Sequence, residues 1–219
     1  MKKIAVIHTS FVSIADLGAL FTEIIPEARI VNIVDDSLLP EVMENGGVTP
    51  AVTRRICAYA VEAAQMGADL IFNQCSSVGE AFDVAARLVT TPMLKIDQAM
   101  AEKVVDMARR ILVVATVSTT LGPSCRLIEA AARAKGKSVD IAPCLVGGAF
   151  DALTREKNRE KHNRLVLEAI EAGAPGSDVV VLAQGSMVAL LSELSRIQKP
   201  VLTSPRLGVE RARTMLGLR

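Results

Sequence analysis

The residues best suited to chemistry in this sequence surround Cys75, within the stretch Asn73-Gln74-Cys75-Ser76-Ser77-Val78-Gly79-Glu80. An apolar, strand-type run precedes this stretch, and residues with helical spacing follow it. Ser77 and Glu80 have the spacing of a capping box, which predicts that a helix begins at Ser77. Cys75 would then face unpaired N–H groups, a position that lowers the pKa of a thiol and favours the reactive thiolate. The alternative is that Cys75 is a small buried hydrophobic residue.

Other polar side chains follow other predicted strands. A strand at 4–7 leads to His8, and a short strand at 93–96 leads to Asp97. Ligands of open parallel sheets bind outside the carboxyl ends of the strands. Cys75, His8 and Asp97 are therefore our catalytic candidates. The predicted substrate-binding residues come from both halves of the chain: Thr9, Ser10, Ser76, Ser77, Thr116, Ser118, Thr119, Thr120, Gly185 and Ser186. Hydroxyls and helix N-termini predict a site for a small anion, with a carboxylate as the favoured ligand, although each hydroxyl could instead only cap its helix.

The elements that position these residues recur along the chain. Residues 2–7 match 109–114, residues 67–71 match 176–180, and residues 91–94 match 199–202, in the same order and at nearly one offset. This duplication predicts an α/β fold with two pseudo-symmetric lobes, each a four-stranded parallel sheet flanked by helices, with the active-site cleft between them. The first lobe is expected to contain residues 1–97 plus 206–219, because the last helix crosses back, and the second lobe residues 98–205.

Local patterns refine this outline. A helix is expected to be capped by Ser13, and another to begin with Thr49 as its cap and a proline in its first turn. Residues 38–48 are predicted to be a loop. The charged run 154–164 is predicted to be the solvated start of a helix that continues to residue 172, and His162 within it is a weak catalytic candidate.

Composition excludes several classes of function. The chain has 25 Lys and Arg against 24 Asp and Glu, and only 3% of its residues are aromatic, so a nucleic-acid partner is not expected. The apolar run near the N-terminus is too short for a signal peptide, and no run is long enough to cross a membrane. The four cysteines have no paired short spacing and, with only two histidines, suggest neither a metal site nor disulfides, so a cytoplasmic location is expected. No dinucleotide-binding or Walker-type loop is present, so no cofactor is expected.

The chain resembles the aspartate/glutamate racemase superfamily, whose relatives include hydantoin racemases, maleate isomerases and arylmalonate decarboxylases. Cys75-Ser76-Ser77 is similar to the Cys-Asn-Thr motif of the family's first lobe, and residues 115–119 are similar to its Ala-Thr-x-x-Thr segment. The resemblance implies a cofactor-independent enzyme that acts on a small amino, hydroxy or keto acid, with Thr119 helping to hold the substrate. We also expect a homodimer or a higher homo-oligomer.

The second cysteine motif of the family does not match. Alignment of Gln74-Cys75-Ser76 with Gln184-Gly185-Ser186 puts Gly185 where the second cysteine should be. Racemases with two cysteines remove a proton from one face and return it from the other, and glycine can do neither. The favoured hypothesis is a racemase-like isomerase that uses Cys75 with His8 or Asp97. The alternatives are a one-cysteine decarboxylase or lyase of the arylmalonate decarboxylase type, and a small-anion binding protein without catalysis.

Overall fold

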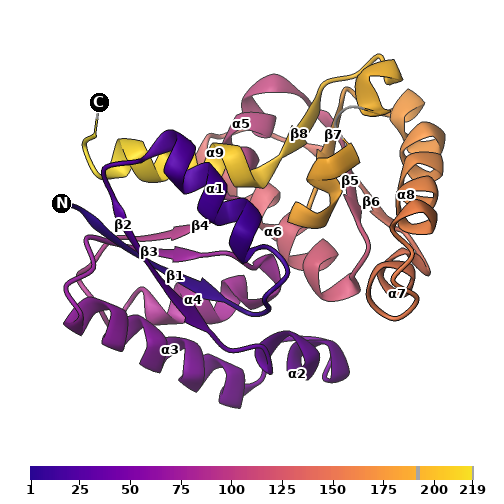
Figure 1. Ribbon diagram of the computed structural model, residues 1–219. Helices are drawn as coiled ribbons and strands as arrows, with labels where there is room; N and C mark the ends of the chain where they lie inside the picture. Colours follow the sequence, from indigo (N-terminus) through magenta and orange to yellow (C-terminus); the bar gives the residue numbers. More distant parts are fainter. Residues whose placement is uncertain (191–192, 219) are drawn as a thin grey trace. The chain divides into compact units, whose positions relative to one another are not determined.

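A computed structural model describes residues 1–190 and 193–218. The chain divides into two compact units: unit 1 is Met1–Gln98 with Pro205–Arg219, and unit 2 is Ala99–Ser204. Each unit holds a four-stranded parallel sheet (Figure 1), in the order β2-β1-β3-β4 or β6-β5-β7-β8. The strands are β1 (Lys3–His8), β2 (Arg29–Val34), β3 (Leu70–Asn73), β4 (Met93–Lys95), β5 (Arg110–Ala115), β6 (Asp140–Leu145), β7 (Val179–Leu182) and β8 (Val201–Thr203). The predicted class, two parallel sheets flanked by helices, is confirmed.

In unit 1, helices cover both faces of the sheet. Ala5 and Ile7 of β1 pack with α2 (Leu38–Glu44), α3 (Pro50–Gln65) and α4 (Gly79–Ala85). Ile4 and Val6 point to the other face and pack with α1 (Ile14–Ile24) and α9 (Ser204–Met215). Successive side chains of a strand alternate between its faces, and a strand buried on both faces is therefore apolar along its whole length. This explains the continuous apolar run of β1.

Unit 2 repeats this arrangement. The helix α6 (Ser118–Ala134) packs against β5 and β6, and α5 (Gln98–Met107) precedes β5 in the chain. The other face of the sheet is covered by α7 (Ala149–Thr154), α8 (Arg159–Gly173) and the 3-10 helix η3 (Gly185–Leu190). Three further 3-10 helices are η1 (Ser76–Val78), η2 (Ala174–Gly176) and η4 (Glu193–Arg196). No helix of the described ranges is long and apolar enough to cross a membrane.

Two local predictions are wrong. Of the predicted loop 38–48, residues 38–44 instead form α2, which buries Leu38 and Val42, one helical turn apart, in the core, and only residues 45–48 are neither helix nor strand. The α-helix does not begin at Ser77 either. The 3-10 helix η1 follows Cys75 instead, and α4 begins at Gly79 with Val78 at its N-cap. This tighter turn buries Val78 completely, so core packing prevails over the capping pattern.

The two predicted helix caps and the charged run have different outcomes in the structure. The Thr49 cap is confirmed, because its Oγ1 accepts a hydrogen bond of 3.1 Å from the N–H of Val52 and Pro50 begins the helix. Ser13 stands at the N-cap of α1, but its hydroxyl has no hydrogen-bond partner in the described part of the chain. The charged run 154–164 begins a helix only in its second part, because α7 ends at Thr154 and α8 runs from Arg159 to Gly173, one residue beyond the predicted end.

Candidate active site

The loop that carries Cys75 is held by the side chain of Asn73, the last residue of β3. The Oδ1 atom of Asn73 accepts a hydrogen bond of 3.1 Å from the N–H of Cys75, and its Nδ2 donates one of 2.9 Å to the carbonyl oxygen of Cys75. Asn73 is completely buried. Both backbone polar groups of Cys75 are thereby satisfied by one rigid carboxamide. Sequence reasoning missed Asn73, although an asparagine two residues before a turn is a known signal.

The Cys75 thiol is half-buried and faces several donors. Burial has the largest effect and raises the pKa of Cys75, whereas the hydroxyl of Thr9 and the N–H and hydroxyl of Ser77 lower it, and the charge of Asp97 raises it further. The net direction is upward, so the predicted lowering of the Cys75 pKa is wrong. The physical reason is that a three-residue 3-10 helix follows Cys75, and its few donors do not outweigh the loss of solvent. At neutral pH the thiol is therefore protonated and able to donate a proton.

Beside the thiol, Ser76 and Asp97 form a buried pair. The Ser76 hydroxyl donates a hydrogen bond of 2.6 Å to Oδ2 of Asp97. The exposed fractions of Ser76 and Asp97 are only 8% and 3%. The other oxygen of Asp97, Oδ1, is buried and has no partner among the described residues. Burial raises the pKa of Asp97, and the hydrogen bond from Ser76 only partly opposes this. Asp97 can therefore hold a proton at a higher pH than an ordinary carboxyl group.

His8 lies on the other side of the sheet. It follows the alternation of Ile4 and Val6, which face α1 and α9, whereas Cys75 packs against the cluster on the opposite face. Its Nε2 lies 2.9 Å from Oδ1 of Asn32, and its Nδ1 is buried without a partner in the described ranges. Burial lowers the pKa of His8, so the ring is neutral at pH 7. The structure does not bring His8 to the Cys75 thiol.

In unit 2, the predicted substrate-binding residues lie where β5 ends and α6 begins. Thr116, Thr119 and Thr120 are buried there, and Ser118 is exposed. Gln184 lies beside Thr116, because its Oε1 accepts hydrogen bonds of 2.5 Å from the Thr116 N–H and 3.0 Å from the Thr116 hydroxyl.

The remaining predicted positions are Ser10, Gly185 and Ser186. In unit 1, Ser10 is half-buried after β1. Gly185 begins η3 and is exposed. The side chain of Ser186 lies outside the described part of the structure.

The register of the parallel strands shows which residue of unit 2 corresponds to each residue of unit 1. Ile7 of β1 pairs with Asn73, and Val114 of β5 pairs with Leu182. The residue after each paired strand residue donates a hydrogen bond in the same way in both units. The Gln74 N–H donates to the Ile7 carbonyl in unit 1, and the Ala183 N–H donates to the Val114 carbonyl in unit 2. Gln74 therefore corresponds to Ala183.

One position further, Cys75 corresponds to Gln184. The 3-10 helices agree, because η1 begins at Ser76 and η3 at Gly185. The alignment that put Gly185 in the second-cysteine position is therefore wrong by one residue. Matching the two glutamines shifted the alignment, whereas the hydrogen-bond ladder of the strands sets the true correspondence. By this register, the residue of unit 2 that corresponds to Cys75 is Gln184.

The family model described as Asp/Glu/hydantoin racemase matches residues 8–212. The chain belongs to this family. Its fold is similar to that of aspartate racemase from Picrophilus torridus, at 15% identity and a TM-score of 0.72, covering 100% of this chain and 96% of that one. It is also similar to glutamate racemase from Francisella tularensis in complex with D-glutamate, at 11% identity and a TM-score of 0.75, covering 99% and 81%.

A third solved structure, a glycine-to-cysteine variant of arylmalonate decarboxylase, matches at 19% identity and a TM-score of 0.63, covering 98% of this chain and 93% of that one. At these identities the likeness to the solved structures shows the fold. A search of curated proteins finds no match.

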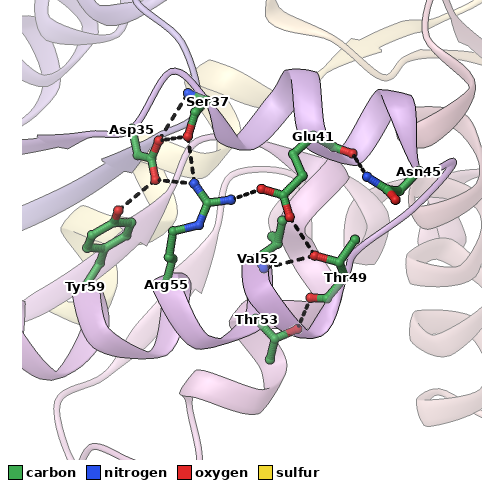
Figure 2. Close-up of polar contacts among 9 residues, drawn as sticks. All are labelled: Asp35, Ser37, Glu41, Asn45, Thr49, Val52, Thr53, Arg55 and Tyr59. Atoms are coloured by element: carbon green, nitrogen blue, oxygen red, sulfur yellow. Dashed lines mark hydrogen bonds and ion pairs between the residues drawn. The ribbon is translucent and has the colours of Figure 1, made fainter.

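Not every polar strand end in this racemase-family chain is free for a ligand. Asp35, which follows β2, accepts hydrogen bonds from the Ser37 hydroxyl at 2.6 Å, the Tyr59 hydroxyl at 2.7 Å and Nη1 of Arg55 at 3.0 Å (Figure 2). Arg55 also pairs with Glu41 of α2. Burial raises the pKa of Asp35, but these partners together outweigh it and hold that pKa below its usual value. This network ties α2 to α3 and engages the Asp35 carboxylate.

Two further kinds of site find little support. A surface hollow of about 610 Å³ lies along α8. It is lined by Arg159, Glu160, Asn163, Arg164, Leu167, Glu168, Glu171 and Glu193. The four glutamates outnumber the two arginines, and this disfavours a carboxylate ligand. Within residues 1–190 and 193–218, no group of three or more His, Cys, Asp or Glu side chains is arranged to hold a metal ion.

Proposed function

We propose that the protein is a racemase-like isomerase that moves a proton at the carbon next to the carboxylate of a small amino, hydroxy or keto acid. It would need no cofactor, and Cys75 would carry the proton. One observation supports this most strongly: a thiol at the end of a strand, held by Asn73, lies beside the buried Ser76–Asp97 pair. Strand ends of parallel sheets are where such folds bind ligands.

In this proposal Cys75 acts as a general acid and base. The raised pKa supports a resting thiol that gives its proton to the carbanion and recovers one when the opposite step occurs. Asp97 is the better candidate for the second acid/base group, because its charge acts on the Cys75 pKa and its own pKa is raised. His8 is the weaker candidate, because it packs on the other face of the sheet and bonds to Asn32.

A specific observation favours a second candidate, a decarboxylase with one thiol. Gln184 takes the position that corresponds to Cys75 in unit 2, and a carboxamide neither gives nor takes a proton near neutral pH. In that reaction a malonic acid loses CO₂, the electron pair of the broken bond remains as an enediolate, and the Cys75 S–H donates its proton to carbon. The thiolate is then reprotonated from water.

Several roles accompany the proposal and await tests. Thr9, Ser10 and Ser77 would bind the substrate in unit 1. The hydroxyls of Thr116, Thr119 and Thr120, with the first-turn N–H groups of α6, have the chemistry to bind a carboxylate. The assembly into a homodimer or a higher oligomer and the cytoplasmic location also remain proposals.

The test is incorporation of deuterium from D₂O, followed by NMR, together with release of CO₂, over a panel of amino, hydroxy and malonic acids. We expect exchange or decarboxylation of at least one acid by the wild type. Cys75→Ala should lower that rate by about 10²- to 10⁴-fold, as expected for loss of a positioned acid/base group. Cys57→Ala is the matched control, because Cys57 is also half-buried but packs in the core on α3. Unchanged activity in Cys75→Ala would remove the proposal.

A further inference from the structure

The helix α2 packs beside the turn that carries Cys75. It contacts η1, the 3-10 helix that follows Cys75, and its Leu38 and Val42 lie in the same buried cluster as Val78 of η1. The Cys75 side chain packs against this cluster as well. The helix α2 is therefore part of the packing within unit 1 that shields the Cys75 thiol from solvent.

The helix α2 cannot keep this position by itself. It has only seven residues, and an isolated helix shorter than about 12 residues is marginal in water. It ends in a Schellman motif, in which the Gly47 N–H donates to the Val42 carbonyl and the Gly46 N–H donates to the Met43 carbonyl. Gly46 has the positive φ of 66° that this ending requires. The position of α2 therefore depends on its contacts with other elements.

Arg55 of α3 makes the polar part of these contacts, and its guanidinium group reaches three residues (Figure 2). Nη1 donates to Oδ2 of Asp35 at 3.0 Å and to the Ser37 hydroxyl at 2.7 Å, and Nη2 donates to Oε2 of Glu41. Ser37 is the N-cap of α2 and Glu41 lies in its middle, so one planar group fixes both its start and its rotation. The side chains of Arg55, Asp35 and Glu41 are 30%, 15% and 31% exposed, and water therefore screens them less than ordinary surface pairs.

We propose that Arg55 is a positioning residue, which holds α2 against the Cys75 turn through Asp35 and Glu41 and so keeps the thiol shielded from solvent. The inference rests on the proposed function, in which a protonated Cys75 thiol gives its proton to the substrate. The helix that carries Arg55 suits this role, because α3 has 16 residues and Thr49 caps its start. A lysine would not replace Arg55, because a single ammonium group lacks the fork that meets two carboxylates at once.

Arg55→Met is the decisive variant, because methionine keeps an unbranched apolar side chain and removes the guanidinium group. The measurement is the rate at which iodoacetamide alkylates Cys75, mapped by mass spectrometry between about pH 6 and about pH 10. Cys57 is the internal reference, because it is also half-buried and packs against the same cluster from α3. A change that only loosened α3 would raise the alkylation of Cys57 as well.

We expect Arg55→Met to raise the alkylation rate of Cys75 at pH 7 by about 3- to 10-fold relative to Cys57. The midpoint of the Cys75 pH profile should fall, because solvent returns to the thiol, and a fall of one unit in its pKa raises the thiolate fraction about tenfold. The matched control is Arg206→Met. Arg206 of α9 also pairs with a glutamate, Glu23 at 2.8 Å, but on the other face of the sheet, so both cysteines should react as in the wild type.

Glu41→Gln is a milder variant. It removes the charge that Arg55 meets but keeps an oxygen for the hydrogen bond of 2.8 Å from the Thr49 hydroxyl. It should raise the Cys75 rate in the same direction by a smaller factor, and it decides the question if thermal unfolding shows that Arg55→Met is not folded. Unchanged alkylation of Cys75 in the folded variants, or an equal rise at Cys57, would overturn the inference.

The two proposals fail in different ways. If the proposed function is wrong, Cys75→Ala keeps the wild-type activity, whatever Arg55→Met does to alkylation. If only the inference on Arg55 is wrong, Cys75→Ala is inactive while Arg55→Met leaves the ratio of Cys75 to Cys57 alkylation at its wild-type value.

Discussion

Replacing Ser76 by alanine removes the hydrogen bond that a buried carboxyl group receives within unit 1. The Ser76 hydroxyl donates to Oδ2 of Asp97 at 2.6 Å, and Oδ1 of Asp97 has no other partner among the described residues. A hydrogen bond to a charged group contributes about 1.5–3 kcal/mol, and one between neutral groups about 0.5–1.5 kcal/mol. The cost of Ser76→Ala should therefore depend on whether Asp97 is ionised.

The direction of the pH dependence follows from the raised pKa of Asp97. Because the folded protein holds this proton more tightly than the unfolded chain, the contribution of Asp97 to stability is complete below the unfolded pKa. It is lost as the pH rises through the folded pKa. Ser76→Ala raises the folded pKa further and removes a donor from the charged form. Its cost should therefore be larger at about pH 9 than at about pH 5.

Thermal unfolding followed by circular dichroism measures this cost. For a chain of this size, about 1.5–3 kcal/mol corresponds to a fall in Tm of about 3–12 °C at the alkaline end. In an Asp97→Asn background the same substitution should cost only the neutral value at both pH values.

Ser124→Ala is the matched control, since the Ser124 hydroxyl is also buried but has no hydrogen-bond partner in the described ranges. It should leave the Tm nearly unchanged. If Ser76→Ala costs no more than Ser124→Ala, or costs the same in the Asp97→Asn background at alkaline pH, the pair does not act as described.

Three further predictions concern the surroundings of the site. Gly208→Ala would place a Cβ 2.6 Å from the Ile96 carbonyl oxygen, so it should lower the free energy of unfolding in urea by about 1–3 kcal/mol. The control is Gly18→Ala on α1, whose Cβ would meet nothing within 4 Å and which should not lower the free energy of unfolding. Tyr59 is the one tyrosine of a chain without tryptophan, and burial with the hydrogen bond to Asp35 raises its pKa to about 12. Ultraviolet titration of the tyrosine should show a midpoint near this value, and a midpoint near 10 would contradict the network. Because the folded pKa is raised, the contribution of Tyr59 to stability should be complete below pH 10 and lost as the pH rises through about 12. Burial raises the pKa of Cys75, so iodoacetamide should alkylate it more slowly at pH 7 than a free cysteine in a peptide; faster alkylation would show a thiolate.

The fold could be predicted from the sequence because its signals are local and repeated. The apolar runs of β1 and β5, and those of β3 and β7, recur in one order, and each is buried in a parallel sheet with the same strand order. A strand that is buried on both faces needs an apolar residue at nearly every position, so its sequence carries the pattern by itself. Thr49 with Pro50 signalled the start of α3 for the same reason, since a helix cap depends only on neighbours along the chain.

The candidate site needed the tertiary structure. Sequence reasoning found Cys75 and Asp97, but neither the hydrogen bond that links Ser76 to Asp97 nor the packing of His8 on the other face follows from spacing along the chain. The pKa of Cys75 depends on how much solvent the fold removes, and this outweighed the expected helix effect. The choice between Gly185 and Gln184 depended on a shift of one residue. Only the hydrogen-bond ladder between β5 and β7 decides that shift, because a ladder joins residues far apart in the sequence and tolerates no slip.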